Sequence, residues 1–242
     1  MNPRRQVAKY LISDFLTAGT SWTLFFVFRK IYFEPKKFGY PIPVDFNDSY
    51  FLGLAILPAL WLLLYYTTGY YKDVYRKSRL SELGQTIGTT FLGVLLIFFA
   101  LILDDTIVVY TNYYLSFFVL FSLHFTITYI PRLSFTTSST HKIHKRIIGF
   151  PTLLVGSDKK ALELYEEMES QPKSTGNKFI GFVNVRYYEK YLMASHLPNL
   201  GELKNINKII EENNVRIVLI AIESHEHELL KTIINRLESS NV

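Results

Sequence analysis

The sequence predicts a membrane α plus α/β protein, in which a four-transmembrane-helix bundle is followed by a partial Rossmann-like parallel sheet domain. Three observations predict this fold class. The first half holds four uncharged apolar stretches, basic residues cluster in alternate connections between them, and strand-like and helix-like segments alternate in the second half. Because the composition changes at about residue 132, we place a membrane domain at 1–132, a basic juxtamembrane connector at 133–150 and an incomplete Rossmann-like domain at 151–242.

The predicted spans are the uncharged runs at 15–28, 49–71, 83–103 and 106–131. The last three are at or above the ~20 residues needed to cross a bilayer core. The first reaches that length only if it begins near residue 11, which places Asp14 near a membrane interface. A cleavable signal peptide is disfavoured because Asp14 interrupts the apolar run and no small-x-small pattern closes it.

Orientation follows from the basic residues, because cytoplasmic connections of membrane proteins retain Lys and Arg. Three connections are rich in these residues: Arg4, Arg5 and Lys9 before the first span; Lys72, Arg76, Lys77 and Arg79 between the second and third; Arg132, Lys142, Lys145 and Arg146 after the fourth. We therefore expect both termini and the second domain on the cytoplasmic side of the membrane. Residues 34–48 and the Asp104-Asp105 turn are expected on the opposite side. The same bias explains most of the net charge of +5, so no nucleic-acid partner is predicted.

Several polar and aromatic residues in or near the spans have competing interpretations. The pairs Tyr65-Tyr66, Tyr70-Tyr71 and Tyr113-Tyr114 are interpreted as anchors at the headgroup level. Asp14 and His124 are ionisable groups within or beside spans, which makes them functional candidates by default. For His124 we favour a hydrogen bond between helices, since small hydroxyl residues surround it.

The second domain begins with a βαβ-like alternation that predicts a parallel sheet covered on both faces. The expected strands are 152–155, 179–183 and 215–222, and the expected helices are near 161–168, 203–210 and 229–237, with a connecting stretch that carries Pro198 and Gly201. A further strand is expected after the last helix. In the usual doubly wound order it would pair with the first strand, so residues 152–155 are expected at an exposed edge.

The candidate cofactor-binding residues are Gly156, Ser157 and Asp158, in the turn after the first strand. A nucleotide or CoA-like ligand would place its phosphates there, on backbone N–H groups at a helix start. The turn lacks the two further glycines of a dinucleotide fingerprint, and Asn184 stands where a ribose-binding carboxylate is expected. Asp158 would also repel an anion, so the alternative is a helix start that Ser157 or Asp158 caps.

No metal site is predicted. The turn at 223–227 holds His225 and His227, but residues two apart on a helix do not share a face. Ser224 as a helix N-cap explains the turn without a metal. The absence of cysteine from the sequence excludes disulfides and thiolate metal sites.

Three features together resemble the N-terminal half of bacterial polyprenyl glycosylphosphotransferases. The first is the set of four spans. The second is the segment Gly69-Tyr70-Tyr71-Lys72, which continues through Tyr75-Arg76-Lys77-Ser78-Arg79-Leu80-Ser81-Glu82-Leu83. The third is the Rossmann-like unit, which begins Thr152-Leu153-Leu154-Val155-Gly156 and includes Phe179-Ile180-Gly181-Phe182, Leu200-Gly201-Glu202-Leu203 and Ile217-Val218-Leu219-Ile220-Ala221. The resemblance implies a multi-pass protein of the bacterial inner membrane. It also implies transfer of a sugar 1-phosphate from a UDP-sugar to undecaprenyl phosphate, at the start of exopolysaccharide or O-antigen synthesis.

In that family the chemistry, with Mg²⁺ and an Asp-Glu pair, belongs to a C-terminal domain that this sequence does not contain. We therefore expect no catalytic residues and no activity in this chain alone. Polyprenyl phosphate and UDP-sugar are expected to bind the missing domain, and the lipid bilayer is the expected direct partner of this chain. A homo-oligomer is a further possibility to test. Two alternatives remain open: the front part of a membrane-bound sugar-nucleotide epimerase or dehydratase, and a non-catalytic membrane adaptor or sensor.

Overall fold

The structure is a computed structural model that describes residues 3–40, 43–102, 111–187, 189–222 and 227–238. Contacts group the chain into two compact units, Asn2–Thr140 and His141–Val242. The first unit is helical, and the second contains the sheet.

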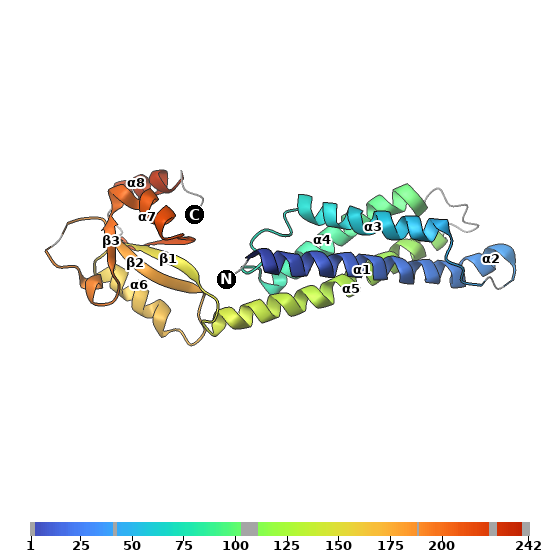
Figure 1. Cartoon of the computed structure of the whole chain (residues 1–242), viewed down its shortest axis with the longest axis horizontal. Helices are drawn as coiled ribbons and strands as arrows, with labels where there is room; N and C mark the ends of the chain where they lie inside the picture. Colours follow the sequence, from blue (N-terminus) through green and yellow to red (C-terminus); the bar gives the residue numbers. More distant parts are fainter. Residues whose placement is uncertain (1–2, 41–42, 103–110, 188, 223–226, 239–242) are drawn as a thin grey trace. The chain divides into compact units, whose positions relative to one another are not determined.

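Four long helices run alongside one another in the first unit (Figure 1). They are α1 (Pro3–Tyr32), α3 (Asp48–Thr67), α4 (Arg79–Ile97) and α5 (Thr111–His144), with a short α2 (Glu34–Phe38) after α1 and a π-helical segment η1 (Phe98–Ile102) after α4. All four are long and apolar enough to cross a membrane, so the structure has apolar helices of spanning length in the number and order predicted. The fourth helix continues through Pro131 to His144, so helix occupies much of the expected connector. The Asp104-Asp105 turn lies outside the described residues.

The bundle has an apolar surface, and it buries polar and charged side chains beside an aromatic core that includes Trp22, Phe25 and Trp61. Large apolar side chains on all four long helices are exposed, among them Ile12, Leu16, Phe51, Leu63, Phe91, Phe118 and Ile130. Buried side chains include Asp14, Glu82, His124 and Arg132. An apolar surface of this extent is unfavourable in water and is matched by lipid chains, so the distribution of side chains supports membrane insertion independently of helix length.

Small residues let the helices approach closely. At Gly93 of α4, a Cβ atom would lie 2.3 Å from Cζ3 of Trp61 on α3, so any side chain there would displace the indole. Helix association in membranes depends on such close packing, because lipid removes the hydrophobic driving force between helices. Pro58 is buried within α3.

The second unit contains a parallel sheet. Its strands are β1 (Phe150–Val155), β2 (Asn177–Asn184), β3 (Asn199–Glu202) and β4 (Ile217–Ile220), in the order β3-β2-β1-β4. The helical segments are α6 (Lys159–Ser170), η2 (Leu192–Ser195), η3 (Leu203–Asn205), α7 (Ile206–Glu212) and α8 (His227–Leu237). This order equals the first four strands of the doubly wound order.

Alternate residues of β1 face opposite sides of the sheet, and both sides are covered (Figure 1). Leu153 and Val155 pack with residues of α7 and α8, including Ile206 and Ile233. Leu154 packs on the other side with Ala161 of α6. Because β1 is buried on both faces, its last three residues, Leu153, Leu154 and Val155, are apolar without alternation, as in parallel strands.

The expected exposed edge at residues 152–155 is wrong, because β1 pairs with β4 on one side and with β2 on the other. Among the described residues the sheet has four strands, one more than expected before the last helix. The missed strand, β3, is short and polar, and it carries a glycine with φ of 136°. It approaches β2 at Gly181, where a Cβ atom would lie 2.5 Å from Cγ of Leu200.

Candidate functional site

The carboxyl ends of β1, β2 and β4 meet at one edge of the sheet. The Gly156 N–H donates to the Val183 carbonyl at 3.0 Å, and the Ala221 N–H donates to the Val155 carbonyl at 2.8 Å. Ligands of open parallel sheets bind outside this edge. The predicted turn Gly156-Ser157-Asp158 therefore lies where a ligand site of this fold is expected.

Gly156 is required by strand packing. Its φ is 132°, and a Cβ atom at this position would lie 2.2 Å from the Ala221 carbonyl oxygen. The neighbouring Ser157 is 3% exposed. Asp158 occupies the N-cap position of α6 with an extended backbone, but its side chain makes no capping hydrogen bond, so the predicted side-chain cap by Asp158 is wrong. The turn thus combines one glycine, a buried hydroxyl residue and a carboxylate.

Asn184 at the end of β2 serves the sheet itself. Its side-chain oxygen accepts a hydrogen bond from Asn199 Nδ2 at 3.3 Å, and its own Nδ2 donates to the Arg186 carbonyl at 3.4 Å. The residue is buried and links β2 to the start of β3. Consequently the position that holds a ribose in dinucleotide-binding proteins holds a structural amide here.

The turn with His225 lies outside the described residues, as does Ser224, the predicted cap of the last helix. Within the ranges that the structure describes, no three His, Asp or Glu side chains gather in a way that could hold a metal ion.

A buried ion pair is the most polar feature of the first unit. Arg132 Nε donates to Asp14 Oδ1 at 2.8 Å, and Arg132 Nη2 lies 2.8 Å from Asp14 Oδ2. Both side chains are buried completely. The interpretation of Arg132 as a basic residue of a cytoplasmic connection is therefore wrong in one respect: α5 continues past it, and its guanidinium lies inside the bundle.

Tyrosines from α3 and the following connection enclose the ion pair. The Tyr71 hydroxyl donates to Asp14 Oδ2 at 2.9 Å. The Arg132 guanidinium lies 4.0 Å from the centroid of the Tyr65 ring and 3.7 Å from that of Tyr70. Such cation–π contacts strengthen when they are shielded from water.

The interpretation of these tyrosines as interface anchors is wrong for Tyr65 and Tyr70, which are fully buried, and for Tyr71, which binds Asp14. Tyr66 and Tyr114 are mostly exposed, as anchors would be.

Glu82 extends the cluster to α4. Tyr70 Oη donates to one carboxyl oxygen of Glu82, and Thr136 Oγ1 donates to the other at 2.9 Å. Tyr10 Oη lies 3.1 Å from Thr136 Oγ1. All four long helices thus contribute to one buried polar cluster, which we call the ion-pair cluster: Tyr10, Asp14, Tyr65, Tyr70, Tyr71, Glu82, His124, Arg132 and Thr136.

His124 joins two helices, as predicted. Its Nε2 lies 2.8 Å from Tyr65 Oη, and its ring stacks on Trp61 with centroids 3.6 Å apart. A polar group inside a bundle that finds a partner on the next helix stabilises their association. The residue therefore belongs to the packing of α3 against α5.

Lys77 covers the cluster from the connection between α3 and α4. Its Nζ donates to the Tyr70 carbonyl and to Gln85 Oε1, the latter at 3.0 Å, and lies over the Tyr70 ring. Burial lowers the pKa of Lys77 to about 7, and the charge of Arg132 acts in the same direction. Burial beside Asp14 raises the pKa of Tyr71, so this phenol stays neutral and donates.

The sheet and the helices that precede it match a known protein family. The match is to the family model of a CoA-binding domain over residues 66–242, which run from the end of α3 through the whole sheet. No curated protein matches the chain. The matched domain occurs in bacterial sugar-transferase-associated proteins. Because the match covers well over half of the sequence, the chain belongs to the CoA-binding domain family.

Proposed function

We propose that this chain is the membrane-anchor and accessory half of a phosphoglycosyltransferase. That enzyme would transfer a sugar 1-phosphate from a UDP-sugar to undecaprenyl phosphate, to begin exopolysaccharide or O-antigen synthesis. In this proposal the bundle spans the bacterial inner membrane, the sheet unit lies in the cytoplasm, and the transfer chemistry belongs to a separate catalytic domain that uses Mg²⁺.

One observation carries the proposal. The family match begins at residue 66, so it includes the connection that holds Tyr70 and Tyr71, then α4 and α5, as well as the sheet. The matched unit is therefore a membrane segment joined to a parallel sheet, in a family whose domain is found in sugar-transferase-associated proteins. This arrangement suits an anchor that holds a soluble unit at the membrane surface.

The turn after β1 does not fit the diphosphate of CoA. Gly156 is occupied in packing against Ala221, and Asp158 places a carboxylate beside the helix start where an anion would bind. The proposal therefore contains no step through CoA. Binding of a nucleotide or CoA-like ligand by Gly156, Ser157 and Asp158 stays a prediction.

That prediction is tested by thermal unfolding of the full chain, since a ligand that binds only the folded state raises the midpoint. CoA, UDP-sugars and NAD are each added to the unsubstituted chain and to Asp158→Asn. A ligand at this turn should stabilise Asp158→Asn more than the unsubstituted chain, because the repelling charge is gone. Equal midpoints with and without every ligand, in both proteins, contradict a ligand site at this turn.

The accessory role is tested in two assays. The purified chain is incubated with labelled UDP-sugars, Mg²⁺ and undecaprenyl phosphate, and we expect no labelled lipid and no UMP release. In membranes of the source bacterium, deletion of the chain should reduce the initial transfer, and expression of the chain should restore it. Transfer by the purified chain contradicts the accessory role, and unchanged transfer after deletion contradicts the link to the phosphoglycosyltransferase.

Two alternatives predict other outcomes. A membrane-bound sugar-nucleotide epimerase or dehydratase needs NAD, so loss of the chain would change UDP-sugar interconversion and leave lipid transfer intact. A membrane adaptor or sensor would affect transfer only when its ligand is present, and it would show a ligand-dependent rise in the unfolding midpoint. A homo-oligomer is compatible with all three roles and is measured separately by light scattering.

A further inference from the structure

A cavity of about 420 Å³ lies in the second unit, at the amino ends of β1 and β2. The segment between α5 and β1 forms one wall, and α6, the start of β2 and Leu197 form the others. This volume is within the range of about 300–1,000 Å³ that ligand pockets occupy. The turn at Gly156 lies at the carboxyl end of β1, so the cavity is separate from that turn, and the proposed function makes no use of it.

The end of α5 places Arg146 in the wall of this cavity. The Arg146 N–H donates to the Ile143 carbonyl and the Ile147 N–H to the Lys142 carbonyl, each at 2.9 Å, a common way for a helix to end in a left-handed residue. Arg146 is that residue, with φ of 58°. Its guanidinium binds the side chain of Glu169 in the last turn of α6 and donates to the Glu169 carbonyl at 2.6 Å. The charge of Arg146 is therefore balanced by Glu169.

Lys178, the second residue of β2, adds a positive charge that no carboxylate balances. Its ammonium makes no ion pair and no hydrogen bond with any residue that the structure describes. Its stem runs beside Gly149, where a Cβ atom would lie 3.0 Å from Lys178 Cβ and 3.8 Å from Lys178 Cδ. Both residues line the cavity. Since Arg146 and Glu169 balance each other, the charged side chains of the cavity leave one positive charge for an occupant.

Ser174 offers a hydrogen-bond donor in the same wall. The residue is 8% exposed, and its Oγ accepts from the Gly176 N–H at 3.0 Å. The Ser174 N–H donates to the His144 carbonyl at 3.3 Å, which holds the loop against the end of α5. No described residue accepts the hydroxyl hydrogen of Ser174, so this O–H can donate to an occupant.

The remaining wall of the cavity is apolar and aromatic. The Tyr165 ring of α6 packs edge-to-face on Phe179 of β2, with ring centroids 5.2 Å apart and planes at 70°. Leu197 and Ile148 add aliphatic surface. A bare inorganic anion would leave this surface in contact with water, and a neutral apolar molecule would cover Lys178 without giving it a partner. An occupant that suits both parts therefore combines an anionic group with an apolar body.

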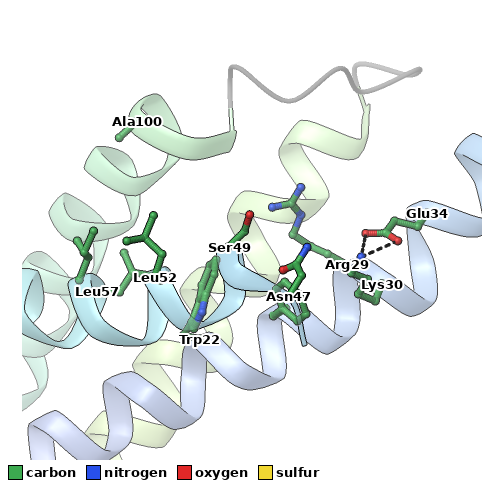
Figure 2. A pocket seen from close by; sticks show the side chains of 12 residues that line it. Trp22, Arg29, Lys30, Glu34, Asn47, Ser49, Leu52, Leu57 and Ala100 are labelled. Atoms are coloured by element: carbon green, nitrogen blue, oxygen red, sulfur yellow. Dashed lines mark hydrogen bonds and ion pairs between the residues drawn. The ribbon is translucent and has the colours of Figure 1, made fainter. Parts of the chain in front are cut away.

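The cavity of the first unit gives a contrast. It has a volume of about 510 Å³ and lies where α1 leads into α2 (Figure 2). There Lys30 Nζ lies 2.8 Å from one carboxyl oxygen of Glu34 and 3.0 Å from the other, so these two charges balance. Arg29 is engaged in an interaction as well. Charge at that cavity therefore selects no ligand, whereas Lys178 leaves a charge to be matched in the second unit.

We propose that the cavity of the second unit binds a small organic acid with one carboxylate and a flat apolar body. The carboxylate accepts hydrogen bonds from Lys178 and Ser174, and the body lies against Tyr165 and Phe179. One negative charge matches the one positive charge that is not balanced. A phosphate monoester carries a charge of about −1.5 to −2 at neutral pH, which would leave an excess of negative charge beside Glu169.

The test measures the rate at which lysines of the full chain are acetylated in phosphatidylcholine nanodiscs, read by peptide mass spectrometry. Phenylacetate is the probe, because it joins one carboxylate to a flat ring. Phenylacetamide keeps this shape without the charge, and acetate keeps the charge without the ring. Lys173 is the internal control, since it is exposed in the loop before β2 and does not line the cavity.

We expect phenylacetate to slow the acetylation of Lys178 about fivefold at about four times its dissociation constant, and to leave the rate at Lys173 unchanged. Phenylacetamide and acetate at the same concentration should leave both rates unchanged. In a second measurement, saturation-transfer NMR detects bound phenylacetate after subtraction of empty nanodiscs. Lys178→Met should remove this signal, whereas Lys173→Met, which removes the same charge outside the cavity, should keep it.

An unchanged Lys178 rate up to the solubility limit of phenylacetate overturns the proposal, and so does equal protection of Lys173 or an NMR signal that survives Lys178→Met. Stronger protection by phenyl phosphate than by phenylacetate contradicts the single negative charge. Protection of Lys178 without any probe in phosphatidylglycerol nanodiscs would assign the cavity to a lipid headgroup instead. Thermal midpoints establish that both variants are folded, and the acetylation measurement on the unsubstituted chain does not depend on either of them.

Discussion

Removing one partner of the buried ion pair should destabilise the bundle more than any surface substitution. Asp14→Asn keeps the size of the side chain but removes the charge that faces Arg132, which is completely buried. Loss of one partner leaves an uncompensated buried charge, which typically costs about 3–5 kcal/mol. We expect a loss of this size in the free energy of unfolding.

Replacing both partners should cost far less. In Asp14→Leu/Arg132→Met both charges of the pair are removed, and Glu82 keeps its hydrogen bonds from Tyr70 and Thr136. Met keeps part of the apolar stem of Arg132 between Tyr65 and Tyr70. Such replacements are often neutral, although removal of the guanidinium from the two tyrosine rings would cost about 1–2 kcal/mol. The double variant should therefore be more stable than Asp14→Asn by at least about 1 kcal/mol.

The assay is reversible unfolding in mixed micelles with increasing dodecyl sulfate, followed by the fluorescence of Trp22 and Trp61. Glu34→Gln is the control, because it breaks a partly exposed pair with Lys30 that should contribute about 1 kcal/mol or less. An Asp14→Asn protein that loses no more stability than Glu34→Gln would show that the buried Arg132 does not need its partner. A double variant as unstable as Asp14→Asn would show the same.

Three further predictions concern other parts of the chain. Because the unfolded chain keeps the Lys77 proton up to its ordinary pKa of 10.5 while the folded chain loses it near pH 7, stability should rise between pH 7 and 10. Dodecyl sulfate titrations at several pH values measure this rise, and a slope unchanged in Lys77→Met contradicts the assignment. The sequence has no cysteine, so single cysteine variants report the orientation of the spans. In whole cells, a membrane-impermeant maleimide should label Lys36→Cys, which is expected outside, but not Lys72→Cys or Lys173→Cys, which are expected in the cytoplasm. The reverse pattern would contradict the proposed orientation. Gly156→Ala should cost about 2–3 kcal/mol or more by thermal unfolding, because its Cβ would lie 2.2 Å from the Ala221 carbonyl oxygen; an unchanged midpoint shows that β1 and β4 adjust easily.

Features that depend on residues close together in the sequence could be predicted from the sequence alone. The four spans follow from uninterrupted apolar runs, because a bilayer requires about 20 such residues whatever the helix contacts. The strands β1, β2 and β4 follow from short apolar runs between helix-like segments. β3 was not predicted because its four residues are exposed or only partly buried and so give no apolar pattern. β3 can lie beside β2 because Gly181 has no side chain, where a Cβ atom would clash with Leu200.

The polar interior of the bundle could be decided only by the tertiary structure. Asp14, Tyr70 and Arg132 are far apart in the sequence, and each has an ordinary local explanation as an interface or loop residue. Their burial depends on where α1, α5 and the connection after α3 meet, which periodicity within one helix does not encode. The same holds for Gly156: the sequence places it in a ligand-binding turn, but its close contact with Ala221 of the distant strand shows that sheet packing already requires a glycine there.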